Sequence, residues 1–592
     1  MAPTELLTIS PTLSFTNFNS KRRICSYQRC MERIPTSRCP AQKSSLGDLS
    51  TELLTLIFKN LRDLDVKSLA NARLLSRRID DIVTPIKFEY LCLNENIISP
   101  RAEIELPRGL QHVYAHTRHV EARSDLDPQR VKFMLEKIER LLSIRWRYVR
   151  ADDFRAGRLW VPSDVLSARR WRSGTELHVE DLPLRDFSGD DEDGDEDGDG
   201  DGDGDGDGDE EPHDTYLRAI PARALVSLKM ASPAPPLVAR LGPLRRLLVA
   251  APRLETFHYR DRGQGTRFAF APGERLPPLR DLSLRSYDWD HSAEAVRQHW
   301  DFSRLRHLAL VDVPLHAFLS STVLPDPASG GGGGGGGLFS RLETLRCEDA
   351  SAHVVPDRRE DATRALCALV RSGSRLRALR LACHVRLFAA DALLPHAAAL
   401  RSLALRDHAG FGDEARPCPT LRAADAGLLA RRLRRLRELE LDLDVGACDD
   451  PAAFLAALCA FPRLDTLVLH TQTVLRPLLE DEGEGGGGGG GGEYEGGDGS
   501  GGGGGVSVDR DYEAAVRTFS FLVGGKPDHS AVPWRSITIN VGGWRRHMVR
   551  RTGAEWRERN LRGVYAERCF VLERGEDGEG EMTMREERAL DT

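Results

Sequence analysis

Residues 462–469 read Pro-Arg-Leu-Asp-Thr-Leu-Val-Leu, and their Leu-x-x-Leu-x-Leu spacing recurs along the body of the 592-residue chain. Several copies follow the same Pro-Arg-Leu or Ser-Arg-Leu lead-in, which chance matches in leucine-rich sequence would not share. Full copies begin at Leu279, Leu305, Leu376, Leu400, Leu436 and Leu464, and looser ones at Leu225, Leu254, Leu342 and Trp534. Seven intervals span the 210 residues from Leu254 to Leu464, a mean period of 30. Short apolar cores at this period predict one strand in each repeating unit.

Helical stretches are expected between these cores, at 362–371, 423–432 and 451–460. In the last of them, Asp450 is placed to cap the helix and Pro451 occupies its first position. Alternating strands and helices predict an α/β fold in which the units stack, because no single unit can bury its apolar face alone. The leucines of the cores should therefore point inward.

Over residues 220–475 this pattern resembles a leucine-rich-repeat solenoid. The resemblance implies an irregular stack of strand–helix units with a concave strand face. The copies depart from the family pattern three residues after the core, where Asn or Cys is usual. Those places hold Val313, Ala350, His384, His408 and Gln472. A ladder of asparagines that satisfies the backbone groups of the turns is therefore not expected.

A second pattern lies near the N-terminus, in residues 46–61. Ser50 is placed to cap a helix, and Glu52 lies in its first turn. Apolar side chains at every fourth place form one stripe, and Leu54 with Phe58 forms an adjoining face. The stripe consists of Leu49, Leu53, Ile57 and Leu61. We expect one face to pack on a helix over 65–82 and the other to need a partner. The alternative is a helix buried inside a larger helical domain.

This segment resembles an F-box, a three-helix module. The match covers residues 45–88 and consists of Leu49, Glu52, Leu53, Ile57, Phe58 and Leu61, then Leu69 and the 73–78 segment of the third helix. Two positions depart from the family pattern. Ser50 replaces the usual proline, and Ile79 stands where many members have tryptophan.

The resemblance implies that the helices dock onto the small adaptor subunit of a cullin–RING ubiquitin ligase. The residues implied for this contact are Leu49, Glu52, Leu53, Ile57 and Leu61. The repeats would hold an unknown substrate protein near the ubiquitin-charged enzyme, without catalysis by this chain. The alternative is a leucine-rich-repeat interaction scaffold unrelated to ubiquitin ligation. Exposure of the 49–61 stripe, or its burial under the repeats, distinguishes the two.

Residues between the inward leucines would lie on the concave side of the repeats. The middle positions there are Ser283, Ala309, Arg346, Arg380, Ala404, Glu440 and Val468. Arg346, Arg380 and nearby Arg406 predict a basic patch for an acidic or phosphorylated partner. The alternative for these arginines is a solvated surface in an arginine-rich protein.

Motifs and composition argue against several other classes. No run of about 18 apolar residues could cross a membrane, and we expect no secretory signal. No His-Glu-x-x-His, phosphate-loop or Gly-x-Ser-x-Gly motif occurs, and the 11 cysteines include no Cys-x-x-Cys pair. We therefore expect no enzymatic activity, no cofactor, no metal and no membrane contact. A cytoplasmic or nuclear location is expected.

The net charge of −7 conceals a basic body. Residues 189–211 hold 15 acidic groups, and the rest of the chain has 83 basic residues against 75 acidic ones. Basic clusters at 21–23 and 431–435 raise the question of nucleic-acid binding. Few aromatic residues accompany them, and the acidic tract would compete for the same surfaces. Nucleic acid is therefore not the expected partner.

The composition predicts the following domain organisation. A disordered segment over 1–44 precedes the F-box-like module at 45–90 and the leucine-rich-repeat-like domain at 91–573. Glycine- and acid-rich insertions at 188–213, 329–337 and 480–505 should be disordered, as should the tail at 574–592.

Overall fold

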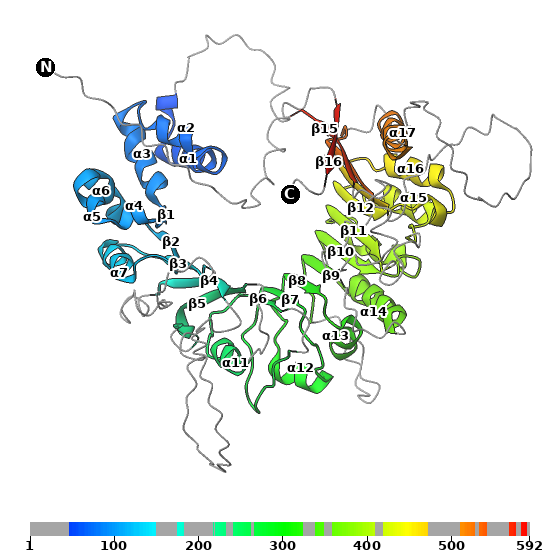
Figure 1. The fold of residues 1–592 in the computed structure, drawn as a ribbon, viewed down its shortest axis with the longest axis horizontal. Helices are drawn as coiled ribbons and strands as arrows, with labels where there is room; N and C mark the ends of the chain where they lie inside the picture. Colours follow the sequence, from blue (N-terminus) through cyan, green and yellow to red (C-terminus); the bar gives the residue numbers. More distant parts are fainter. Residues whose placement is uncertain are drawn as a thin grey trace, which may run out of the picture. The chain divides into compact units, whose positions relative to one another are not determined.

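A computed structural model describes most of the chain from residue 46 onward (Figure 1). The described residues are 46–149, 174–182, 217, 220–231, 241–261, 266–323, 338–348, 358–373, 375–408, 418–471, 510–526, 532–541, 568–575 and 582–588. The chain divides into two compact units. Unit 1 comprises Met1–Ala122 with Leu126–Ile144, and unit 2 comprises Arg123–Asp125 with Arg145–Thr592.

Unit 1 begins with three α-helices. They are α1 (Thr51–Leu64), α2 (Val66–Ala72) and α3 (Arg77–Phe88), after a short 3-10 turn η1 (Leu46–Asp48). The Ser50 side chain accepts a hydrogen bond from the Leu53 N–H at 3.4 Å, which confirms the predicted cap of α1. The remaining elements are β1 (Tyr90–Cys92), α4 (Glu95–Ile98), α5 (Pro100–Glu105), α6 (Pro107–His116), β2 (His119–Arg123) and α7 (Pro128–Lys137), with β1 and β2 pairing in parallel.

The helix expected over 65–82 is two helices, and this expectation was wrong. The chain leaves α2 at Arg73 and starts α3 at Arg77, because Ser76 caps the new helix by accepting from the Ile79 N–H at 3.2 Å. Asp65 caps α2 in the same way, by accepting from the Lys67 N–H at 2.9 Å. The segment 73–76 therefore precedes the third helix.

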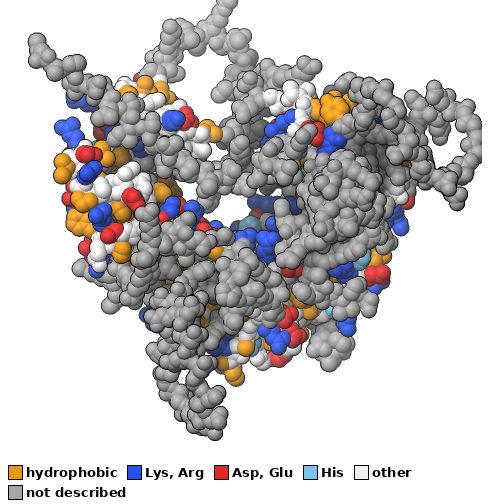
Figure 2. Space-filling model, viewed as in Figure 1, with side chains coloured by type: hydrophobic (Ala, Val, Ile, Leu, Met, Phe, Trp, Pro, Cys, Tyr) orange, Lys and Arg blue, Asp and Glu red, His pale blue; other side chains and the backbone are white. Residues whose placement is uncertain are grey.

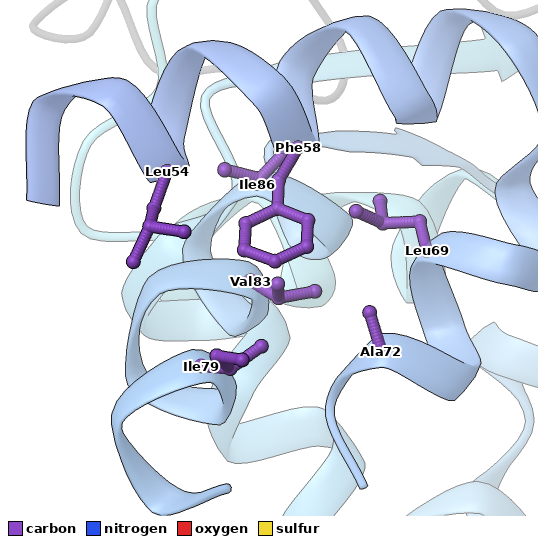
Figure 3. Packing of buried hydrophobic residues seen from close by; sticks show 7 residues of the cluster. All are labelled: Leu54, Phe58, Leu69, Ala72, Ile79, Val83 and Ile86. Atoms are coloured by element: carbon purple, nitrogen blue, oxygen red, sulfur yellow. The ribbon is translucent and has the colours of Figure 1, made fainter. Parts of the chain in front are cut away.

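One apolar cluster joins the three helices (Figure 3). Each helix contributes buried side chains, and Leu49, Leu61 and Ile82 pack against their edge. The cluster consists of Leu54 and Phe58 from α1, Leu69 and Ala72 from α2, and Ile79, Val83 and Ile86 from α3. Burying one such leucine or phenylalanine contributes roughly 1.5–3 kcal/mol, so this cluster is what holds the helices together.

Helix α6 packs on α3, which explains why the first unit extends beyond residue 90. The Thr117 hydroxyl donates to the Phe88 carbonyl at 2.9 Å, and the rings of Phe88 and His112 stack with centroids 5.5 Å apart. Residues 91–122 and 126–144 consequently group with the three helices. The sequence had placed them with the repeats, although no leucine core occurs among them.

Unit 2 contains a long open sheet whose strands follow one another in sequence order from β4 to β16 (Figure 1). The strands are β4 (Glu176–Leu182), β5 (Leu225–Met230), β6 (Thr256–Arg260), β7 (Asp281–Arg285), β8 (His307–Val311), β9 (Thr344–Glu348), β10 (Ala378–Cys383), β11 (Ser402–Asp407), β12 (Glu438–Asp442), β13 (Thr466–Thr471), β14 (Ser536–Val541), β15 (Arg568–Arg574) and β16 (Met582–Arg588). Strand β3 (Ser143–Arg147) runs across the boundary between the units. Neighbours pair in parallel from β4 to β14.

The helices of unit 2 lie along one side of this sheet in Figure 1. They are α11 (Gly242–Val249), α12 (Ala293–His299), α13 (Leu315–Thr322), α14 (Arg359–Ser372), α15 (Ala423–Arg432), α16 (Pro451–Cys459) and α17 (Arg510–Gly524), with 3-10 turns η4 (Ala222–Ala224), η6 (Ala390–His396) and η7 (Val445–Ala447). The Asp450 side chain accepts from the Ala453 N–H at 2.8 Å, and Pro451 opens α16. The three helices predicted between the cores are confirmed.

All ten predicted cores are strands of this sheet, and their register aligns the central apolar residue of each core with that of the next. The aligned row is Leu228, Phe257, Leu282, Leu308, Leu345, Leu379, Leu403, Leu439, Leu467 and Ile537. Every member of the row is buried. The α/β class and the inward direction of the leucines are therefore confirmed.

Aspartates bind backbone groups of neighbouring units at the ends of the strands. Asp407 Oδ2 accepts from the Val385 N–H at 2.8 Å, and Asp442 Oδ2 accepts from the Asp407 N–H at 2.6 Å. Asp444 Oδ2 accepts from the Cys418 N–H at 2.7 Å. These residues lie one to three places beyond the last leucine of their cores. This aspartate ladder satisfies buried N–H groups as the absent asparagines would have done.

The C-terminal end of the sheet differs from the expected disordered tail over 574–592. Strand β16 lies within that range and pairs antiparallel with β15, which pairs antiparallel with β14. That expectation was wrong for Met582–Arg588, because the chain turns back there and a strand can pair without a leucine core. The predicted disordered segments at 1–44, 188–213, 329–337 and 480–505 lie outside the described residues.

Replacing Leu54 with alanine should destabilise unit 1 by about 3 kcal/mol, because it removes a fully buried side chain from the cluster. The neighbouring change Leu53→Ala should cost less than about 0.5 kcal/mol, since that side chain is exposed. Hydrogen exchange of the α1–α3 amides in the full chain measures both values. Equal losses would contradict the division of α1 into a buried and an exposed face.

Replacing Asp407 with alanine should destabilise the sheet around β10 and β11 by about 2 kcal/mol, because the buried Val385 N–H loses its acceptor. The matched variant Asp407→Asn retains an acceptor oxygen and should lose less. Hydrogen exchange of residues 383–408 provides the measurement. If the two variants lost the same amount, the ladder would not be what stabilises this turn.

Candidate functional site

Helix α1 presents four large apolar side chains to solvent, three near its start and Leu64 at its end. Leu53, Leu56 and Ile57 are 50%, 58% and 42% exposed, whereas Leu54 and Phe58 are buried in the cluster. Residues three and four apart share one side of a helix, so these three side chains adjoin one another. We call them the α1 apolar face. Single exposed leucines are common on protein surfaces, but a group of adjoining ones is typical of an interaction site.

The five residues predicted for adaptor binding divide between this face and the cluster. Leu53 and Ile57 belong to the α1 apolar face, and Glu52 is also exposed. Leu49 and Leu61 are half-buried and pack against the cluster instead. The predicted stripe is thus exposed in its middle and covered at both ends.

Glu52 carries its charge at the start of α1. Hydrogen bonds from its own backbone N–H and from the Ser50 hydroxyl hold the pKa of its carboxyl below the ordinary value. A carboxylate in the first turn also complements the positive end of the helix dipole. Glu52 is therefore a charged group at the edge of the α1 apolar face.

Several exposed leucines near this region were not predicted, among them Leu56, Leu74 and Leu75. Leu56 lies three residues after Leu53, and that spacing in the sequence was sufficient to find it. Leu74 and Leu75 occupy the turn between α2 and α3, where they are 86% and 65% exposed. They were missed because the expected continuous helix would have turned part of this segment inward.

The open face of the unit 2 sheet carries the side chains that alternate with the buried leucines. The predicted middle positions lie in one register row across β7–β13. That row is Ser283, Ala309, Arg346, Arg380, Ala404, Glu440 and Val468. All of them are at least partly exposed except Ala404, which is buried.

The three arginines predicted as a basic patch do come together on this face, but carboxylates accompany them. Arg346 forms two hydrogen bonds to Glu348, at 3.0 and 2.9 Å. Arg380 bridges Glu348 at 2.7 Å and Glu440 at 3.3 Å. The arginines thus belong to an ion-pair network.

The network continues into more buried side chains. Arg406 bridges Glu440 at 3.2 Å and Asp442 at 2.9 Å, and His470 Nε2 lies 2.9 Å from Glu440 Oε1. Three arginines therefore face three carboxylates, and this part of the open face is close to neutral. Glu440 links two arginines and one histidine, a role that its place in the middle row did not reveal.

The described residues contain no group of three or more His, Cys, Asp or Glu side chains that could hold a metal ion. Burial raises the pKa of the Cys383 thiol well above its ordinary value and that of Cys459 to about 11. Both side chains are therefore protonated at neutral pH and are poor nucleophiles. Among the described helices, none is long and apolar enough to cross a membrane.

No protein-family model matches the sequence. No curated protein is significantly similar to it. The resemblances that bear on function therefore rest on the residues of the chain and on the geometry of the two surfaces described above.

Replacing Glu440 with glutamine should destabilise unit 2 by about 2 kcal/mol, because Arg406 and Arg380 lose a shared counter-charge in a partly buried site. Glu513→Gln, at an exposed position of α17, should cost less than about 0.5 kcal/mol. Denaturant unfolding of the full chain compares the two variants. Equal effects would show that the network adds nothing beyond an ordinary surface charge.

Proposed function

We propose that this chain is a non-catalytic substrate-recognition subunit of a cullin–RING E3 ubiquitin ligase. In this proposal the F-box-like helices of unit 1 dock on the small adaptor subunit of the ligase. The leucine-rich-repeat-like sheet of unit 2 binds the protein to be modified. The observation that carries the proposal is the α1 apolar face, which leaves Leu53, Leu56 and Ile57 exposed on a helix whose other side forms a core.

The three short capped helices support the F-box-like part of the proposal. Two residues of the match, Phe58 and Leu69, lie in the cluster, and two more, Leu49 and Leu61, pack against it. Ile79, at the place where many F-boxes have tryptophan, is buried in the cluster. The Arg78 guanidinium donates to the Leu49 carbonyl at 2.7 Å and so ties the start of α3 to the start of α1.

The sheet of unit 2 supports the repeat-like part. Parallel strands whose apolar residues align in register, with helices along one side, present their alternate side chains on the other side, where a protein partner could bind. The aspartate ladder replaces the asparagines of the family pattern in the same structural role.

Such a subunit promotes the reaction by bringing two other proteins together, without chemistry of its own. It binds two partners at once, so the reaction between them becomes effectively intramolecular and gains from raised effective concentration and fixed orientation. No side chain of this chain needs to enter the chemistry of ubiquitin transfer.

Charging the α1 apolar face tests the adaptor contact. Full-length chain carrying Leu53→Asp and Ile57→Asp should lose co-purification with the adaptor subunit, while the wild-type chain retains it. Each leucine or isoleucine buried at an interface contributes roughly 1.5–3 kcal/mol, so the double change should weaken binding by at least about a hundredfold.

The matched control is Ile104→Asp with Leu142→Asp, two exposed apolar positions of unit 1 outside α1–α3. It should bind the adaptor as the wild type does. If the Leu53/Ile57 variant still bound the adaptor, the proposal that the adaptor docks on the α1 apolar face would be wrong. If the folded wild-type chain did not bind at all, the protein would instead be a repeat scaffold outside the ligase.

A further inference from the structure

Basic side chains occur over the surface of both units. In Figure 2, Lys and Arg side chains are visible on each unit, with Asp and Glu side chains among them. On the open face of unit 2, carboxylates balance the arginines of the ion-pair network described above. A surface for an anionic partner therefore requires cations that no acid of the chain already holds.

Such cations lie at the edge of the unit 2 sheet where strands β10–β14 begin. These five strands run parallel, so the residues that lead into them share one edge. The first apolar residue of each core is buried there, and arginines stand directly before or after it. We call these arginines the arginine edge. They are Arg375, Arg401, Arg435, Arg437, Arg463 and Arg535.

The side chains of the arginine edge are all exposed, and none of them forms an ion pair or a side-chain hydrogen bond with any described residue. Backbone bonds fix their spacing. The Arg401 N–H donates to the Arg377 carbonyl at 2.8 Å, and the Arg437 N–H donates to the Arg401 carbonyl at 2.8 Å. Arg401 and Arg437 are therefore neighbours across one strand spacing, about 4.8 Å. Like charges side by side repel, and an anion bound between them would relieve that repulsion.

Acids are few at this edge. The segments that lead into the five strands are 373–378, 397–402, 433–438, 460–466 and 525–536, and together they contain eight arginines and three acids. The acids are Glu438, Asp465 and Asp528, the last of which lies outside the described residues. Asp465 accepts a hydrogen bond from the Thr466 hydroxyl at 2.9 Å. Positive charge therefore exceeds negative charge here even if every acid is counted.

The helices that precede these strands end at the same edge and add no negative charge. The last four residues of α14, α15, α16 and α17 contain no acid. Helix α15 ends in Arg431 and Arg432, which are exposed and complement the negative end of its dipole. The excess of cations is thus not balanced from the helix side.

The same edge is balanced where β7–β9 begin. Arg280 lies 2.9 Å from Glu255, and Arg306 lies 3.3 Å from Glu343. Glu343 also holds Arg377, the residue before β10, at 3.3 Å. Cations without partners in the described residues therefore follow one another only beyond Arg377, in the units of β10–β14.

We infer that the arginine edge binds an acidic segment of the recruited protein, with carboxylate or phosphate groups seated between the guanidinium groups of neighbouring strands. Four strand spacings separate β10 from β14, about 19 Å, which an extended peptide of about six residues spans. Arginines before and after one buried leucine, such as Arg435 and Arg437, are two positions apart, or about 7 Å. Each guanidinium can bind a carboxylate or a phosphate through two parallel hydrogen bonds.

Nucleic acid fits this narrow band less well than a peptide. Binding of single-stranded nucleic acid uses aromatic side chains as stacking platforms, but Phe461 and Trp534, the aromatic residues of these segments, are buried. The grooves of a DNA duplex are about 6 and 12 Å wide, so a duplex covers more than a band about 7 Å across. It would extend over the carboxylates beside the band, among them Glu438 and Glu440 of β12.

The inference rests on the proposed function only in assigning the acidic segment to a recruited protein. Its test is fluorescence anisotropy with the full-length chain and a labelled polyglutamate peptide of about eight residues. A peptide of the same length in which phosphoserine alternates with glycine distinguishes phosphate from carboxylate as the source of the anion. A polyglutamine peptide and a short DNA duplex serve as comparison probes.

We expect Arg401→Gln with Arg437→Gln to weaken binding of the acidic peptides about tenfold, because it removes two neighbouring cations that no described acid holds. The matched control, Arg280→Gln with Arg306→Gln, removes the same charge from exposed positions of the same edge where carboxylates hold it. Its affinity should stay within about threefold of wild type. Circular dichroism verifies that both variants are folded, and Arg437→Gln is compared with Arg306→Gln if a double variant is not.

The chain's own acidic tract at 189–211 can compete with an added peptide. A chain lacking these residues is therefore tested beside the wild type, and tighter binding after the deletion supports the site. If neither chain binds an acidic peptide, or if polyglutamine binds equally well, the inference is wrong. Equal losses in the two double variants, or tighter binding of the duplex through Arg401 and Arg437, also overturn it. Adaptor binding is measured separately, so either proposal can fail alone.

Discussion

The lateral packing of one leucine row on the next is the interaction on which unit 2 depends. A single strand–helix unit cannot bury its apolar face alone, so a unit is stable only in the stack. In-register alignment from Leu282 to Ile537 keeps these side chains in a continuous core. The aspartate ladder then satisfies the backbone groups that the turns bury between units. Loss of one unit's packing is therefore felt chiefly by the units on either side.

Helix α1 uses one short run of apolar residues for two purposes. Neighbouring leucines point about 100° apart on a helix, so Leu54 enters the core while Leu53 remains outside. The same short run of sequence supplies both the interior of unit 1 and a surface suited to a partner. A helix with apolar residues on more than one side is the sequence signature of that double use.

Much of this architecture could be predicted because its causes are local. The ten leucine cores, the caps at Ser50 and Asp450 and the helix at 423–432 follow from periodicity and end signals within a few residues. The break before α3 was missed because Leu74 and Leu75 extend an apolar pattern through a turn. Because Ser76 caps α3, the chain starts a new helix there instead of continuing α2.

What could not be predicted depends on contacts between distant units. Arg380 meets Glu440 across 60 positions of sequence, so the predicted basic patch proved to be a neutral network. The residue spacing within one strand does not reveal which side chains of the neighbouring strands will lie beside it.

The antiparallel pair at the C-terminal end of the sheet limits how far such an array can extend. A parallel stack of identical steps has no intrinsic length, and an open strand at its end invites another chain to add to it. Strand β16 ends in Arg585, Glu586, Glu587 and Arg588, and consecutive charges on a strand at the edge of a sheet discourage that addition. The reversal of direction at β15 and the charged edge of β16 together oppose the addition of a further strand at this end of the sheet.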